Sequence, residues 1–531
     1  MDLSVSSAAT SRRRRTLALT ALSAVAALAL AGCASGGADD ASGSDTLTLV
    51  AAAAPTSINP ALANADTVGG WYSQLPYDPL IRLTPEGTLE PDLAVSWQFL
   101  DDQSKEFELT LREDVMFSDG TEMTAEAVAD SINYFVTEGV NGAAWLGGAD
   151  TVAEATGENT VVMHLGESNS TLPFRLTQRS ITGSVIAPAG LENPEALKNQ
   201  SFGAGPYVLD TDQTVPDNRY VYTANENYWN PDDVHYDEVV IQVSGSNSAS
   251  FQALEAGDAD IMRGDLATAT SAEAAGLTVA STPASIYGVG FVDREGSVIP
   301  ELADVRVRQA LAYAIDRESI VQAAWGDAGI AGNALTPPDL AGYSDEVSET
   351  YAYDPEKAKE LLAEAGYADG LSFTIGAWNL APADAATQAV VQNWADIGVQ
   401  ATIEFYSDPG QMATDVLAGK FGIVTYYYGA VQTGATMSDF VSGAATQYNP
   451  FGTTDPQIEA ALNSALTSPD EAVQAAAYEE AMSVAMVDDV WLTNIAYAPS
   501  FIIMSDRVTG TEFGTALSAP DMAHLVRPAG D

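Results

Sequence analysis

The stretch 371–405 reads LSFTIGAWNLAPADAATQAVVQNWADIGVQATIEF and decides the fold. Residues 371–375 predict a strand, and the residues after it predict a helix, because apolar side chains recur there every three or four positions: Ala386, Val390, Trp394 and Ile397. Gly398 ends this helix, and apolar residues alternate with polar ones over 399–405, which predicts a second strand. We expect this β-α-β unit to have parallel strands and a right-handed crossover.

The residues just before this unit predict a further helix with well-defined ends. Asp354 is expected to be its N-cap and Pro355 its first residue, and Gly366 ends it. The two leucines at 361 and 362 are expected to face inward. The C-terminal half of the chain therefore contains an α/β domain.

The first third of the chain predicts strands and one amphipathic helix. A strand is expected over 46–50, and apolar residues alternate with polar ones over 107–111. Thr124 is expected to cap a helix whose inward face is formed by Val128, Ile132 and Phe135.

The N-terminus has the pattern of an export signal. Four arginines, 12–15, precede a run of small apolar residues over 17–31 that is too short to span a bilayer comfortably. Cys33 is the only cysteine of the chain, and the string around it resembles a bacterial lipoprotein signal, in which this cysteine becomes lipidated. The alternative is an ordinary secretory signal with an incidental cysteine. We expect residues 1–33 to be the signal peptide and the small, polar residues 34–45 to be a flexible tether.

Composition limits the partners of the mature protein. The 531-residue chain has a formal net charge of −52, and without the signal 17 basic residues face 72 acidic ones, a net charge of −55. Such a charge argues against binding nucleic acid or a bare anionic membrane. About 500 residues exceed what one hydrophobic core usually serves, so two or three domains are expected.

Four segments carry a resemblance to a known family. They are PDLAVSW (91–97) with LREDVMFSDGT (111–121), GAGPY (203–207) with NYW (227–229), VRVRQALAYAIDR (305–317), and YDPEKAKELL (353–362). In this order and spacing they resemble the extracellular solute-binding proteins of peptide and nickel ABC importers, the large family 5. Most of these motifs read as scaffold. The third, for example, ends where Asp316 is expected to cap a second short helix.

The resemblance implies an α/β fold of the periplasmic-binding-protein type (class II, large), with two lobes and an extra subdomain in the first lobe. Lobe I would comprise 46–288 and 493–531, with the inserted subdomain at 75–195, and lobe II would comprise 289–492. Two hinge strands would join the lobes near 287–292 and 491–497. The resemblance also implies a monomer without cofactor that captures a peptide or similar polar solute and delivers it to an ABC permease at the outer face of the cell membrane.

Aromatic residues at three loops after strands are candidates for the ligand cleft, because ligand pockets are apolar and aromatic with a few polar groups. Trp71 and Tyr72 follow Gly69 and Gly70, Trp378 and Asn379 follow the strand at 371–375, and Tyr427 and Tyr428 follow a strand at 421–425; Tyr287 lies at a hinge. The alternative for each ring is packing within its own lobe. Trp97 and Trp229 belong to scaffold motifs and are expected in the core.

One departure from the family bears on the ligand. Dipeptide-binding members usually carry an aspartate shortly after the tyrosine position, where it grips the free amine of the peptide. Here no acidic residue occurs between Tyr428 and Asp439. Either Asp439 takes this role from a shifted position, or the ligand lacks a free amine at that point, which keeps modified peptides and oligosaccharides open.

Catalytic and metal chemistry are not indicated. The three histidines, His164, His235 and His524, have no metal-ligand spacing, and no nucleophile elbow or phosphate-binding loop occurs. The residues therefore predict a binding protein and no catalytic or metal site. An extracellular hydrolase of peptides or glycans and a surface sensor on the same fold remain as alternatives.

Overall fold

The computed structural model describes residues 46–63, 69–85, 87–140, 142–338, 340–429, 433–443, 445–468, 470–510 and 521–530. These ranges belong to one compact unit of the chain, Gly43–Asp531. The predicted signal peptide with Cys33 and the predicted tether lie outside them. In the ranges given, the structure contains no helix of the length and apolar character that a membrane crossing requires.

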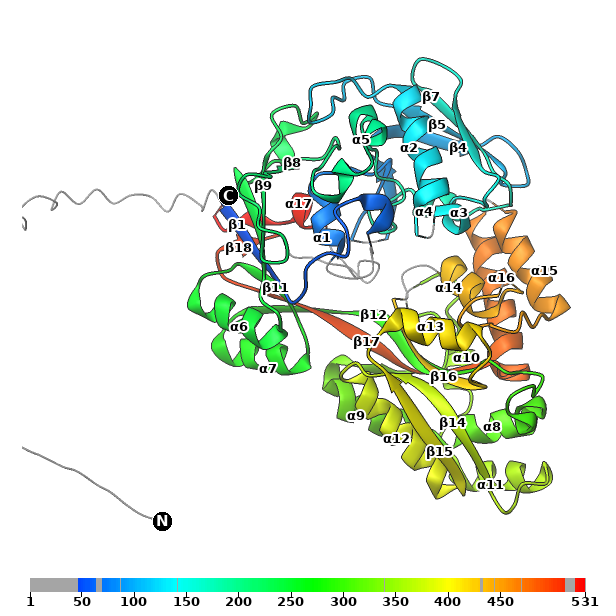
Figure 1. Ribbon diagram of the computed structural model, residues 1–531. Helices are drawn as coiled ribbons and strands as arrows, with labels where there is room; N and C mark the ends of the chain where they lie inside the picture. Colours follow the sequence, from blue (N-terminus) through cyan, green and yellow to red (C-terminus); the bar gives the residue numbers. More distant parts are fainter. Residues whose placement is uncertain are drawn as a thin grey trace, which may run out of the picture. The chain divides into compact units, whose positions relative to one another are not determined.

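Eleven strands within these ranges form one large sheet (Figure 1). Its order is β15 (Val399–Tyr406), β14 (Leu371–Trp378), β16 (Ile423–Tyr428), β12 (Thr278–Phe291), β17 (Leu492–Met504), β11 (Ile261–Gly264), β1 (Thr46–Ala51), β10 (Glu238–Val243), β9 (Arg219–Ala224) and β8 (Tyr207–Leu209), and β13 (Ile330–Ala331) also pairs with β17.

The predicted β-α-β unit is confirmed. β14 and β15 pair in parallel from Leu371 with Val399 to Trp378 with Tyr406, and helix α12 (Ala383–Asp396) connects them. Val390 and Trp394 of α12 are fully buried, and the Trp394 indole donates a hydrogen bond to the Leu311 carbonyl at 2.9 Å. The apolar spacing of the sequence thus marks the face that packs on the sheet.

The long strands β12 and β17 join the two halves of this sheet. They pair antiparallel from Thr278 with Met504 to Gly290 with Leu492, with register shifts at Pro283/Ser285 and Tyr287/Gly288. At one end β17 pairs with β11, and at the other end β12 pairs with β16. Figure 1 shows the two strands crossing the middle of the molecule side by side. Two strands therefore carry the sheet from one half to the other.

Each half of the sheet has its own core. Leu49, Val239 and Ile241 belong to the core around β1 and β10. Leu254 of helix α6 (Asn247–Ala256) and Ala272 of α7 (Leu266–Ala275) belong to a separate small cluster with Val50 of β1. Ile375 and Trp394 belong to the core around β14, which includes α8 (Val305–Tyr313), α9 (Arg317–Trp325) and α11 (Pro355–Glu364). A further cluster of buried residues lies among α14 (Thr433–Val441), α15 (Pro456–Leu466) and α16 (Glu471–Ser483).

A second, four-stranded sheet has the order β4 (Ala94–Phe99), β5 (Glu106–Leu111), β7 (Thr160–His164) and β6 (Val152–Ala155). Phe107 and Leu109 of β5 are fully buried with Val128, Ile132 and Phe135 of α2 (Ala125–Glu138), as the sequence patterns predict. The remaining elements are α1 (Gly69–Gln74), β2 (Ile81–Leu83), β3 (Leu89–Pro91), α3 (Gly142–Trp145), α4 (Leu172–Arg175), α5 (Pro188–Glu192), α10 (Asp345–Glu349), α13 (Pro409–Leu417), β18 (Val508–Thr509), α17 (Met522–Leu525), β19 (Arg527–Pro528) and the 3-10 and π-helical turns at 60–62, 196–198, 231–233, 300–303, 326–328 and 484–488.

The predicted helix caps are confirmed. Thr124, Asp316 and Asp354 accept hydrogen bonds from the amides of Ala127, Ser319 and Lys357 at 3.2, 3.1 and 2.8 Å. These side chains satisfy amides that the first helical turn leaves without partners. Gly366 and Gly398 follow their helices with φ of +94° and +89°, a conformation that glycine adopts at no steric cost.

Candidate ligand-binding site

Tyr428 and Asp439 lie together in the structure. The Tyr428 hydroxyl donates a hydrogen bond to the Asp439 carboxylate at 2.6 Å, and both side chains are half-buried. Tyr428 is the last residue of β16 and Asp439 lies on α14, so strand and helix bring the two groups to one place. A carboxylate in this position can accept a further hydrogen bond from a cationic or polar group.

Aromatic rings surround this pair. The rings of Phe440 and Tyr448 stack at 4.0 Å between centroids, and Tyr428 meets them edge-on at 5.3 and 5.8 Å. Tyr426 meets Phe440 at 4.8 Å from the other side of the cluster. This aromatic packing fixes the orientation of the Tyr428 ring and hence of its hydroxyl.

Tyr287 and Tyr427 form a second group with Trp325. The strand register places Tyr287 opposite Tyr427, with ring centroids 6.5 Å apart, and the Trp325 ring lies 5.5 Å from Tyr287 and 6.5 Å from Tyr427. Tyr287 is fully buried and its hydroxyl shares a 2.8 Å hydrogen bond with Thr387. Burial raises the pKa of Tyr287 above its usual range, and the Thr387 hydrogen bond lowers it only in part, so the phenol stays neutral.

Trp71 and Tyr72 lie on helix α1, whereas the sequence predicted a loop there. All six residues of this helix are buried. The Tyr72 hydroxyl donates to the Ala53 carbonyl at 3.2 Å, and the Tyr72 carbonyl accepts from Tyr222 at 3.1 Å. A pair of glycines favours loops, but burial of the two large rings in the core around β1 stabilises the helical turn here.

Trp378 and Asn379 lie at the end of β14, and Trp378 is still part of the strand. Its half-buried ring packs on a small cluster that includes Val292, Tyr406 and Phe421. Asn379 is exposed and donates to the Ser407 hydroxyl at 3.2 Å. The tyrosines at 426–428 are likewise in a strand and not in the predicted loop, because β16 pairs with β12 along this stretch.

The structure thus groups some of the predicted residues and separates others. It brings Tyr428 together with Asp439 and Tyr287 together with Tyr427. Trp71 and Tyr72 belong to the core around β1, Tyr287 belongs to the core around β14, and Trp378 packs on a third cluster. Trp97 and Trp229, expected in the core, are partly buried and pack against the edge of the core of the four-stranded sheet.

Arg263 and Trp325 were not predicted from the sequence. The Arg263 guanidinium donates to the Ser500 hydroxyl at 2.8 Å and is half-buried. Burial raises the pKa of Tyr427, and the positive charge of Arg263 acts against this rise, which places Arg263 near the tyrosine. Arg263 is one of 21 lysines and arginines in the chain, which is a weak signal; Trp325 carries no local signal, because its partners come from distant strands.

Two of the histidines form hydrogen bonds with acidic residues. His164 Nδ1 lies 2.6 Å from Glu106, and His524 Nδ1 lies 2.8 Å from Asp521 while its Nε2 lies 3.0 Å from the Tyr228 hydroxyl. Across the part of the chain that the structure describes, no group of three or more His, Cys, Asp or Glu side chains is arranged to hold a metal ion. The histidines therefore have structural partners here.

A buried group of charges surrounds His524. Asp78, Asp92 and Asp521 are almost fully buried, and Arg82 pairs with Asp92 at 2.8 Å. The pKa of Asp92 is raised to about 7. Burial is the main cause and the Asp78 carboxylate adds to it, while the positive charge of Arg82 acts to lower the pKa. Burial would lower the pKa of His524, but the Asp521 carboxylate raises it on balance. This cluster joins α17 to the segment 78–92.

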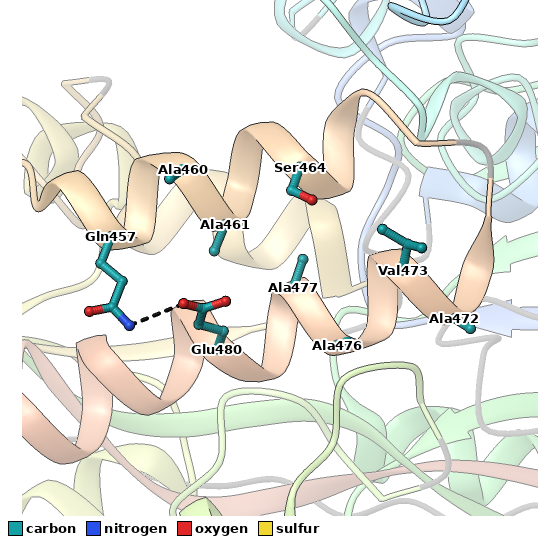
Figure 2. A pocket seen from close by; sticks show the side chains of 9 residues that line it. All are labelled: Gln457, Ala460, Ala461, Ser464, Ala472, Val473, Ala476, Ala477 and Glu480. Atoms are coloured by element: carbon teal, nitrogen blue, oxygen red, sulfur yellow. Dashed lines mark hydrogen bonds between the residues drawn. The ribbon is translucent and has the colours of Figure 1, made fainter.

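A surface groove of about 510 Å³ lies between α15 and α16 (Figure 2). Alanines and Val473 line most of it, and Gln457 donates to Glu480 across it at 3.1 Å. None of the predicted site residues lines this groove. It is a seam between two packed helices and not the predicted ligand cleft.

Comparison with known proteins identifies the relatives of this chain. Residues 88–448 match the sequence model of the bacterial extracellular solute-binding proteins, family 5. The heme-binding protein A of Haemophilus influenzae is 27% identical over 88% of this chain and 90% of its own length, and the dipeptide-binding protein of Escherichia coli is 28% identical over 68% and 72%. The structure of HbpA2 from Haemophilus parasuis superposes with a TM-score of 0.77 at 22% identity, over 91% of this chain and 99% of that chain. These matches are binding proteins and not enzymes, and their fold is the two-lobed periplasmic-binding-protein fold.

Proposed function

Since this chain belongs to the bacterial extracellular solute-binding proteins of family 5, we propose that it is the lipid-anchored receptor of an ABC importer. It captures a peptide or a similar polar solute between two lobes and delivers it to a permease in the membrane. The observation that carries this proposal is the pair β12 and β17, which among the strands that the structure describes carry the sheet from one core to the other.

The lobe boundaries in this proposal are those that the family resemblance implies. Lobe I takes 46–288 and 493–531, with the inserted subdomain at 75–195, and lobe II takes 289–492. The junction near 287–292 falls at the C-terminal end of β12, and the junction near 491–497 falls at the start of β17. Two adjacent strands bend more easily than a wide sheet, so rotation about them opens and closes the space between the lobes.

The ligand site in this proposal lies where the lobes meet. Its residues are Trp71, Tyr72, Tyr287, Trp378, Asn379, Tyr427, Tyr428 and Asp439. The Tyr428–Asp439 pair supports this assignment, since it presents a carboxylate among aromatic rings. The named ligands of the relatives, heme and a dipeptide, differ widely, so the fold alone does not select one.

The anchor rests on the sequence around Cys33. Acyl chains on this residue hold the protein at the outer face of the membrane, and residues 34–45 give the globular part reach toward a permease. Two or more acyl chains are needed for a stable hold, because one chain binds a bilayer only marginally.

A thermal-shift titration tests solute capture. Protein that begins at Ala34 is mixed with di- to pentapeptides, their N-acetylated forms and oligosaccharides. A compound that binds the folded state raises the melting temperature with its concentration, since unfolding must then release it. We expect at least one peptide class to do so, with an affinity that calorimetry confirms. A shift that comes with consumption of the compound contradicts the receptor function.

A further inference from the structure

Ser170 of the predicted inserted subdomain caps a helix of predicted lobe II. Its amide donates to the Leu466 carbonyl at 3.1 Å, and its hydroxyl donates to the Ala465 carbonyl at 2.8 Å. Both carbonyls end helix α15. The last carbonyls of a helix lack the amide partners of the helix interior, and Ser170 donates to two of them from almost 300 residues away in sequence. The Ala465 carbonyl also accepts from the Ser468 amide at 3.4 Å.

The neighbouring Asn169 holds Ser170 in this position. Its side-chain oxygen accepts from the Thr171 amide at 3.1 Å and from the Thr171 hydroxyl at 2.7 Å, and its side-chain nitrogen donates to the Trp145 carbonyl at 2.9 Å. Asn169, Ser170 and Thr171 are each only 7–8% exposed. The turn is therefore preorganised before it meets α15.

The turn that carries Ser170 and helices α14 and α16 also pack closely beside these hydrogen bonds. A Cβ added at Gly434 of α14 would lie 2.9 Å from the Thr171 methyl group and would overlap the Tyr478 hydroxyl of α16. Burial raises the pKa of Tyr478 to about 12, while the nearby Arg175 of α4 acts to lower it. Glycine is thus required where the turn meets α14 and α16, as in a packed interface.

We propose that Ser170 is an interlobe latch, which favours the closed arrangement before any solute binds. Ser170 belongs to predicted lobe I and α15 to predicted lobe II, so these contacts break when the lobes rotate apart. Opening then exposes the end of α15 and gives up two hydrogen bonds. This inference rests on the proposed function, since it needs two lobes that move.

Pulsed electron paramagnetic resonance measures the latch without any solute. Protein that begins at Ala34 contains no cysteine, so spin labels can be placed at V95C and V473C, two exposed sites on β4 and α16. The S170A variant loses one buried hydrogen bond, and we expect the ratio of short to long label distances to fall about two- to tenfold. S104A is the matched control, because the buried Ser104 hydroxyl of the same subdomain has no hydrogen-bond partner among the described residues.

An unchanged distance distribution in S170A contradicts the latch. A second measurement covers the case in which S170A is poorly folded. The G434A variant places a Cβ 2.9 Å from the Thr171 methyl group and disturbs the same contact without altering Ser170. With the same label pair we expect the ratio of short to long distances to fall in folded G434A; an unchanged distribution also contradicts the latch. Neither measurement uses a ligand. If the latch is absent, the parent protein can still bind its solute. If no solute is found, the label distances still test the latch.

Discussion

The Tyr428 hydroxyl donates to the Asp439 carboxylate at 2.6 Å, and this bond joins the last residue of β16 to the last turn of α14, eleven positions further along the chain. Asp439 is the first acidic residue after the tyrosines of β16. The structure therefore places a carboxylate beside Tyr428 although the sequence lacks the family's usual aspartate segment. A carboxylate has several acceptor positions, so one that accepts a hydrogen bond from a phenol can also accept one from a ligand amine.

The role of Asp439 can be tested with paired peptides. If its charge holds a free amine, the D439N variant binds a free-amine peptide about 10- to 100-fold more weakly, because a charge-assisted hydrogen bond is lost. Binding of the N-acetylated form of the same peptide stays unchanged. Isothermal titration calorimetry measures both, and equal losses for the two peptides contradict the role.

The buried Tyr287–Thr387 hydrogen bond predicts a stability effect at one proposed hinge. Tyr287→Phe removes a 2.8 Å bond without opening a large cavity, so the free energy of unfolding should fall by about 1 kcal/mol. Denaturant unfolding of Y287F, T387V and the double variant measures this. T387V also removes the 2.8 Å hydrogen bond that the Thr387 hydroxyl donates to the Ala383 carbonyl, so its loss should exceed that of Y287F. The double variant should lose less than the sum of the two single losses, because both single variants remove the Tyr287–Thr387 bond; fully additive losses would contradict this bond.

The buried charges near His524 predict a pH dependence of stability. Burial and Asp78 raise the pKa of Asp92 from 3.8 to about 7, so the folded protein holds a proton that the unfolded chain releases. This contribution to stability is present below pH 4 and is lost as the pH rises toward 7.

The D92N variant replaces this carboxyl group with an amide that does not titrate. The free energy of unfolding should therefore fall less steeply between pH 4 and 7. Denaturant unfolding at a series of pH values measures the slope, with E90Q, a change at an exposed acidic residue of β3, as the control. If D92N and the parent keep the same slope, Asp92 does not carry the proton.

The anchor prediction concerns Cys33. In full-length protein expressed in a bacterium that acylates lipoproteins, the parent should sediment with the membrane and its mature N-terminus should carry the mass of acyl chains. The C33A variant should lose both properties. Membrane sedimentation of C33A equal to that of the parent contradicts the anchor.

Local signals were sufficient for much of the fold. The caps at Thr124, Asp316 and Asp354 are where the sequence placed them, since a capping side chain acts on amides two or three residues away. The parallel pairing of β14 with β15 also followed from local periodicity. The two-lobed fold class, in contrast, came from the family resemblance and agrees with the matching structures.

Features set by distant contacts were predicted less well. Gly69–Gln74 reads as a loop but is a buried helix, and Tyr426–Tyr428 read as a loop but pair with β12. Trp325 meets Tyr287 and Tyr427 only because α9 packs near the paired strands, and Ser170 meets α15 across almost 300 residues. Short-range patterns carry no information on such partners.

Native mass spectrometry of protein that begins at Ala34 tests solute capture most directly. The protein is measured after purification without added ligand and again after mild unfolding. We predict release of an intact small solute, such as a peptide, which rebinds when returned to the refolded protein and is not altered over hours. Release of a cleavage product, or conversion of the returned solute, would contradict the receptor function.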